Sequence, residues 1–213
     1  MTPLLLSITA LLAYFLGCVD TTQVACKQFL KRDLRSFGRG KSGLEALFRE
    51  TGWKGVVAVY VPECLKIILA VVVGYLLLMI RNHAAAGSML AYFCLLMGTA
   101  FPATRRFKGG NCLLALCVGA LCVSFKAGLF VVVVFAVVLA LWRYLSLACI
   151  CASLAGILGV WVFVEESICI ELSLFCALII IARHFGHILR IIHHQEPKIS
   201  ARKDLSYKFD EEF

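Results

Sequence analysis

The chain has 213 residues, of which 62% are hydrophobic and only 16% are charged, with a formal net charge of +8. In soluble domains charged residues make up about a quarter of the chain, so these values and a mean hydropathy of +0.91 exclude an ordinary soluble fold. The apolar runs are continuous rather than alternating, and each is near the ~20 residues that cross a hydrocarbon core as a helix. We therefore expect an all-α polytopic membrane protein.

The apolar runs predict seven transmembrane helices separated by short polar breaks. The first run has no basic segment before it and no cleavage site after it, so we interpret it as a retained helix. Only Lys126 and Gly128 mark the turn between the fourth and fifth runs. The seven helices form one expected domain over residues 1–192, followed by a polar tail over 193–213. The expected spans are 3–26, 55–80, 87–104, 111–125, 127–143, 145–164 and 167–192.

Basic residues gather on one side of these spans. They lie in the loop over 31–54, in the loop over 105–108, at Arg143 and in the tail. The positive-inside rule therefore predicts an N-terminus outside and a C-terminus in the cytoplasm. No aromatic side chains are interleaved with these cations to stack bases, so we expect membrane lipids and no nucleic acid as partners.

The chain contains eleven cysteines, but many lie inside apolar runs and none forms a CxxC pair. Reduced thiols that act as small hydrophobic residues are the better interpretation. His184 and His187 could be a metal pair, but a metal site usually needs at least three well-placed ligands. We expect no metal and no cofactor.

Three segments on the basic side could bind an anion. In the first, GRGKSGLEALFRE, glycines free the backbone N–H groups and cations add charge. A flexible basic loop is the alternative, because glycine-rich loops are common. The candidate binding residues of this segment are Gly38, Gly40, Lys41, Gly43 and Arg49.

The second segment, AFPATRRFKGGNC, joins the third and fourth spans. Pro102 can end one helix, and Gly109 and Gly110 can start the next with free N–H groups at its positive end. A plain cytoplasmic turn is again the alternative. The candidates here are Lys108, Gly109, Gly110 and Asn111.

The third segment, RHFGHILRIIHHQEPK, ends the last span. His184, His187, Arg190 and His194 share one helix face, and such a face is costly in a membrane unless it points into the protein or a wet cavity. Ser146 and Cys149 open the sixth span, where a serine is more often a cap than a nucleophile. Glu63 and Lys66 could form a structural pair or take part in catalysis. These alternatives stay open on the sequence.

Taken in order, these segments resemble the bacterial acyl-phosphate:glycerol-3-phosphate acyltransferase family (PlsY), from AYFLG at 13–17 to EPK at 196–198. The family's first loop, GSGNxGxTNxxR, is matched at Gly38, Gly40, Gly43 and Arg49. Its second motif, HxFPxxxxFKGGKG, is matched at Phe101, Pro102, Phe107, Lys108, Gly109 and Gly110. Its later regions are matched at Ser146, His184, Ile188, Arg190 and Glu196.

Several positions depart from the family's motifs. Lys41 replaces asparagine, Asn111 replaces the lysine of GGKG, and His187 replaces the asparagine of the last motif. The other departures are Arg39 for serine, Glu45 and Ala46 for threonine and asparagine, Thr99 for histidine, Cys112 for glycine and Cys149 for serine.

The resemblance implies a multi-pass protein of the bacterial inner membrane with a cytoplasmic active site. It implies transfer of an acyl chain from acyl phosphate to the 1-hydroxyl of glycerol 3-phosphate, the first step of phospholipid synthesis. No catalytic side chain is assigned, because the substrate's own phosphate could take the hydroxyl proton. The altered motifs leave a second hypothesis open: a catalytically impaired paralogue that binds lipid or acyl phosphate, or that belongs to a membrane complex. No obligate protein partner is evident.

Overall fold

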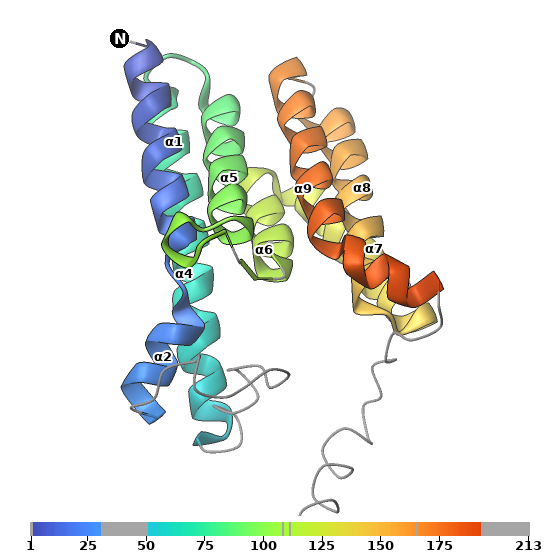
Figure 1. The fold of residues 1–213 in the computed structure, drawn as a ribbon. Coiled ribbons are helices and arrows are strands. Elements are labelled where there is room, and N and C mark those ends of the chain that lie inside the picture. The colour runs from blue at the N-terminus through green and yellow to red at the C-terminus, as the bar shows by residue number, and fades with distance from the viewer. Residues whose placement is uncertain (1, 31–50, 108, 111, 165, 193–213) are drawn as a thin grey trace, which may run out of the picture.

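The computed structural model describes residues 2–30, 51–107, 109–110, 112–164 and 166–192, and it describes the helix over 186–192 by its backbone alone. Within these ranges the elements are helices, with no strand (Figure 1). They are α1 (Thr2–Cys18), α2 (Thr21–Leu30), α4 (Trp53–Met79), α5 (Ala84–Ala100), the 3₁₀ turn η2 (Ala103–Arg105), α6 (Leu113–Val123), α7 (Phe125–Trp142), α8 (Leu145–Phe163) and α9 (Ser167–Ile192).

Five helices of the described part are long and apolar enough to cross a membrane, and the bent pair of α1 and α2 would make a sixth. The fourth expected span, over 111–125, contains α6, which has only 11 residues. At 1.5 Å per residue this helix is about 16 Å long, roughly half of the hydrocarbon thickness. The all-helical polytopic fold is confirmed, and seven full crossings stay a prediction.

The first expected span, a single helix over 3–26, is wrong in one respect. The helix breaks at residues 19 and 20, and its two parts are bent by 41°. Asp20 explains the break, because its Oδ1 accepts hydrogen bonds from the backbone N–H groups of Thr22 (3.1 Å) and Gln23 (3.3 Å). A side chain that caps the next helix in this way ends the previous one.

The α5 helix lies at the centre of the bundle and packs against α1, α4, α6 and α9, while α7 and α8 form a pair on the far side of α9 (Figure 1). The contact between α1 and α5 depends on Gly17 and Gly98, because a Cβ atom on either would collide with the backbone of the other helix. Small residues allow such close approach of helices in membranes. The outer faces are covered by exposed apolar side chains, as a lipid-facing surface requires.

The described parts of the second and third candidate segments lie at one end of the bundle. The ends of α1, α5 and α9 and the starts of α4, α6 and α8 all lie there, opposite the start of α1 (Figure 1). Which end faces the cytoplasm stays a prediction. The expected domain boundary at residue 192 stays a prediction, because the tail over 193–213 lies outside the described residues. All eleven cysteines are free thiols, as expected.

Candidate functional site

The α5–α6 turn, which we define as residues 101–112, is built from unusual backbone. Arg106, Phe107 and Cys112 have φ angles of 52°, 61° and 56°, in the left-handed region that side chains other than glycine rarely adopt. Strained backbone of this kind clusters at functional sites and persists only where the surroundings hold it. Contacts from two sides hold this turn.

Gly109 lies where the turn approaches the end of α5 most closely. A Cβ atom at this position would collide with the backbone oxygens of Thr99 and Ala100. The carbonyl of Gly109 accepts a hydrogen bond from Nη2 of Arg183 at 2.6 Å. The next N–H, of Gly110, donates to the carbonyl of Thr99 at 3.2 Å. The free N–H that we expected at Gly110 is therefore engaged in this structure, and α6 begins only at Leu113.

A polar pocket with a volume of about 300 Å³ lies between the α1–α2 break, α4 and the α5–α6 turn. Two ion pairs line it. Arg105 contacts Asp20 at 2.7 Å, and Lys66 contacts Glu63 at 2.8 Å. Gly110 and Cys112 line the side of the pocket nearest the turn. The pocket thus joins the α5–α6 turn to charged groups that no sequence motif had connected to it.

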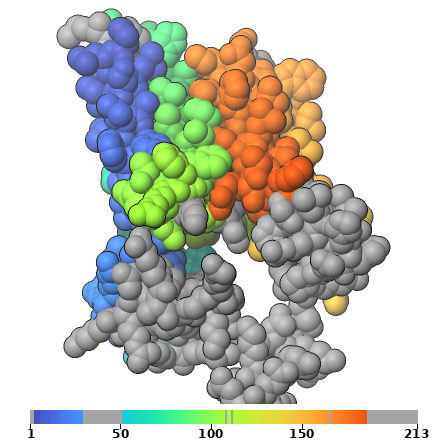
Figure 2. Space-filling model, in the orientation of Figure 1, coloured from blue at the N-terminus to red at the C-terminus, as the bar shows by residue number. Residues whose placement is uncertain are grey.

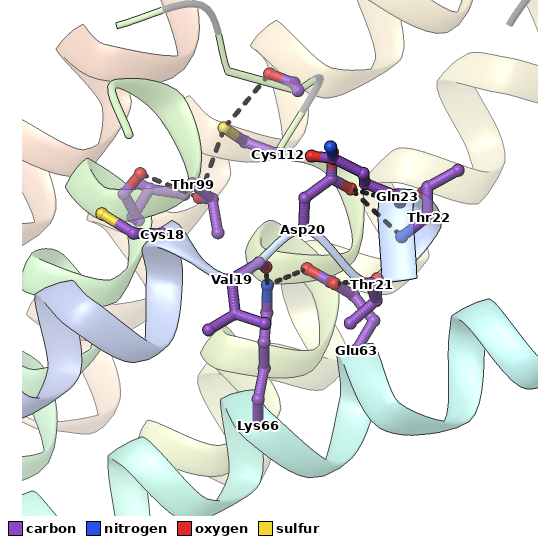
Figure 3. A network of polar contacts seen from close by, with 12 residues as sticks. Cys18, Val19, Asp20, Thr21, Thr22, Gln23, Glu63, Lys66, Thr99 and Cys112 are labelled. Atoms are coloured by element: carbon purple, nitrogen blue, oxygen red, sulfur yellow. Dashed lines mark hydrogen bonds and ion pairs between the residues drawn. The ribbon is translucent and has the colours of Figure 1, made fainter. Parts of the chain in front are cut away.

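The pair of Glu63 and Lys66 bridges the two halves of the broken helix (Figure 3). Lys66 Nζ donates to the carbonyl of Val19 at 2.8 Å, and Thr21 Oγ1 donates to Glu63 Oε2 at 2.6 Å. Lys66 therefore satisfies a carbonyl left open at the end of α1, and Glu63 holds the start of α2. Of the two alternatives, the structure supports the structural pair.

Cys112 is buried, with 8% of its surface exposed. Its Sγ lies 3.6 Å from Thr99 Oγ1 and 3.6 Å from the carbonyl of Gly110 (Figure 3). Burial raises the pKa of the Cys112 thiol, and the hydrogen bond to Thr99 and the charge of Arg183 offset this only in part. A protonated, buried thiol is a poor nucleophile.

On α9, His184 is buried, with 3% of its surface exposed. Its Nδ1 lies 2.9 Å from the carbonyl of Ile180. Because a carbonyl oxygen can only accept, Nδ1 carries the hydrogen, and in the neutral ring Nε2 is then the acceptor.

Ser146 and Cys149 lie on the first turn of α8 and are buried, with 4% and 1% of their surfaces exposed. Their part in a site stays a prediction. Groups of three or more metal-ligating side chains are absent from the described ranges. The other candidates lie outside the residues or side chains that are described: Gly38, Gly40, Lys41, Gly43, Arg49, Lys108, Asn111, His187, Arg190 and Glu196.

Sequence reasoning missed two residues that the structure brings to the turn. Asp20 pairs with Arg105, and Arg183 binds the carbonyl of Gly109. The sequence contained an indication of both residues. An ionisable residue inside an apolar run is energetically unfavourable in a membrane and therefore indicates a specific partner. Neither partner could have been named, because Arg183 and Gly109 are 74 positions apart.

These features define a class of protein: an integral, multi-pass helical membrane protein with a strained, glycine-containing turn held against a histidine-bearing helix. Its fold is that of PlsY, an integral membrane glycerol 3-phosphate acyltransferase. The crystal structure of the glycerol 3-phosphate form matches with a TM-score of 0.74 at 23% identity, covering 92% of this chain and 96% of that chain. The lysophosphatidic acid form matches with a TM-score of 0.73.

The family model described as Glycerol-3-phosphate acyltransferase matches residues 7–194. The chain belongs to this family. The glycerol-3-phosphate acyltransferase of Thermoanaerobacter pseudethanolicus is 27% identical over 198 residues, covering 93% of this chain and 98% of that protein. The enzyme of the same name from Staphylococcus aureus strain Newman is 28% identical, covering 92% and 98%. The resemblance noted in the sequence is confirmed.

Proposed function

We propose that this protein is a membrane glycerol-3-phosphate acyltransferase that uses acyl phosphate as its donor and forms lysophosphatidate. The observation that carries the proposal is the contact between Arg183 and Gly109. It joins two segments that are far apart in the sequence and that both match the family's motifs. The family's chemistry and the fold, shared with proteins solved with glycerol 3-phosphate and with lysophosphatidic acid, support the same function.

In the proposed reaction, glycine-rich backbone over 38–43 and 109–110 holds the acyl phosphate. Arg49, His184 and His187 hold glycerol 3-phosphate. The 1-hydroxyl oxygen attacks the acyl carbonyl carbon, a new ester C–O bond forms, and the C–O bond to phosphate breaks. The leaving phosphate takes the hydroxyl proton, so the protein's task is to gather and orient two anions.

The acyl chain would lie along the outer surface of the helices or enter between them near the bilayer. An apolar cavity lies among α5, α6, α7, α8 and α9, but its volume is only about 30 Å³. A space of that size holds about one or two water molecules. The donor's chain would therefore need another location, or a rearrangement of these helices.

A second candidate function is a catalytically impaired paralogue that binds lipid or acyl phosphate. The hydrogen bonds of Thr99, which stands where the family's motif has histidine, favour this second function. The Thr99 hydroxyl donates to the carbonyl of Leu96 within its own helix, and its carbonyl accepts from Gly110. Two motif positions thus serve packing, and a turn used for packing has fewer donors left for an anion.

For its location, we propose the bacterial inner membrane, with the N-terminus outside and the site and C-terminus in the cytoplasm. The basic residues in the loops that the sequence predicts on the cytoplasmic side support this orientation. A reporter that is active only in the cytoplasm should be active when it is fused after Phe213, and a reporter that is active only in the periplasm should not. Activity of only the periplasmic reporter would show that the orientation is the reverse of the one proposed.

Complementation tests the proposed function. Expression in a bacterium that lacks its own acyl-phosphate acyltransferase should restore growth, and Arg49→Ala should restore it poorly. Arginine's planar fork suits phosphate oxygens, and losing one such contact in the transition state costs about 100-fold in rate. Failure of the wild-type protein to restore growth, although it is present in the membrane, would favour the impaired paralogue.

A further inference from the structure

Arg183 of α9 contacts both ends of the α5–α6 turn. Its Nη2 donates to the carbonyl of Gly109, and its guanidinium carbon lies 6.0 Å from the centre of the Phe101 ring. A cation at this distance over a ring face is attracted by it. On the face shown in Figure 2, the lime-green turn lies between the blue α1 and the orange α9. One side chain thus reaches from α9 across the turn.

The peptide between Gly109 and Gly110 is held at both of its ends. Its oxygen accepts from Arg183, and its N–H donates to the carbonyl of Thr99 on α5. Because a peptide unit is planar, two opposed hydrogen bonds fix the direction of the whole plane. Gly109 permits the approach, since a side chain would collide with the end of α5.

We propose that Arg183 is a positioning residue: it holds the Gly109–Gly110 peptide, and through it the α5–α6 turn, in register with α9. Arg183 is followed directly by His184, which we place at glycerol 3-phosphate, so the same contact sets the spacing between the two proposed substrate groups. The inference deepens the proposed function and rests on it for its kinetic consequences. Its structural consequence is independent of catalysis.

The charge on Arg183 gives the contact its strength. A hydrogen bond from a charged donor is stronger than a neutral one, and a lost partner leaves the Gly109 carbonyl unsatisfied near the protein interior. The two contacts come from one flat guanidinium, which reaches the carbonyl while covering the Phe101 ring. A lysine could supply the charge and one donor, but not the flat face.

Cys112 is a built-in reporter of this geometry. Its thiol is 8% exposed and lies against Thr99 and the carbonyl of Gly110, so it is shielded only while the turn keeps its place. Removal of Arg183 should release the turn and expose the thiol. The gain in exposure outweighs the lost positive charge, because burial is the largest cause of the raised pKa of Cys112.

The experiment measures the rate at which N-ethylmaleimide labels Cys112 in the full-length protein in detergent, by mass spectrometry of its peptide. Cys112 should be labelled about tenfold faster in Arg183→Ala than in the wild type, which is the factor expected for the loss of a hydrogen bond from a charged donor. Arg183→Lys should recover most of the protection. The matched control Arg81→Ala removes an exposed arginine that comes after the last residue of α4, and it should not change the rate.

A second variant approaches the same peptide from the α5 side. Gly109→Ala should push the peptide away from Thr99 and Ala100 and should also speed labelling of Cys112. If Arg183→Ala does not fold, Arg183→Gln takes its place, and the same criterion applies. Unchanged labelling of Cys112 in a folded Arg183→Ala or Arg183→Gln protein overturns the proposal.

Kinetics separate positioning from a loss of folded protein. Arg183→Ala should raise the KM for acyl phosphate about tenfold with a smaller change in kcat, and Arg183→Lys should restore it, whereas misfolding would lower only the maximal rate. An unchanged KM with unchanged labelling contradicts the proposal. Faster labelling of the variant, in a protein whose wild type transfers no acyl group, supports the positioning role and contradicts the proposed function instead.

Discussion

The α5–α6 turn is held differently on its two sides. On the α1 side three contacts hold it: the Tyr14 hydroxyl donates to the carbonyl of Phe101 (3.0 Å), the Thr104 hydroxyl donates to a carbonyl at the end of α1 (3.2 Å), and Arg105 pairs with an aspartate. On the α9 side, Arg183 donates a hydrogen bond to Gly109 and lies over the Phe101 ring. A single substitution can therefore remove both of these contacts, whereas on the α1 side it removes only one of three.

The largest effect should come from the pair that holds the α1–α2 break together. Lys66→Met removes the cation that forms the ion pair with Glu63. Breaking a buried ion pair costs about 3 kcal/mol or more. The free energy of unfolding, measured in mixed micelles with increasing denaturing detergent, should fall by that amount. The matched double variant Glu63→Leu/Lys66→Met should recover most of the loss. A single variant as stable as the wild type would show that the break does not depend on this pair.

A smaller effect should come from the glycines of the turn. Gly109→Ala forces a side chain into the backbone of α5, and overpacking of this kind costs about 2 kcal/mol. Gly110→Ala is the matched control, because a Cβ atom there meets open space. Thermal unfolding should separate the two variants by several degrees. Equal unfolding temperatures would mean that the turn has room to move away from α5.

The smallest effect should come from Arg105→Ala. This arginine is 35% exposed, and partly exposed ion pairs contribute less than about 1 kcal/mol. Two other contacts remain on the α1 side, so labelling of Cys112 should stay slow, in contrast to Arg183→Ala. Fast labelling of Cys112 in Arg105→Ala would contradict the claim that the α1 side is redundant.

The sequence predicts the helices well because hydropathy is a local property. The last expected span, over 167–192, has the same bounds as α9. The break at residues 19 and 20 was not predicted, since Val24, Ala25 and Cys26 were assigned to the same apolar span as the residues before the break. Its signal was Asp20 followed by two threonines, a pattern typical of a helix start.

The candidate site was predictable only in part. The sequence predicts that the glycine turn and the end of α9 lie on one side of the membrane, and the structure places both at one end of the bundle. The contact of Arg183 with Gly109 was not predictable, because it depends on how α9 packs against α5. The prediction of a free N–H at Gly110 was wrong for the same reason, because the carbonyl of Thr99 at the end of α5 accepts its hydrogen bond.

We propose that this chain, despite its altered motifs, transfers an acyl group from acyl phosphate to glycerol 3-phosphate. The most direct measurement is the formation of lysophosphatidate by the purified protein from radiolabelled glycerol 3-phosphate and acyl phosphate. We expect the formation of lysophosphatidate to depend on both substrates and on protein concentration, and its rate to fall about 100-fold in Arg49→Ala. A folded wild-type protein that forms no lysophosphatidate would contradict the claim.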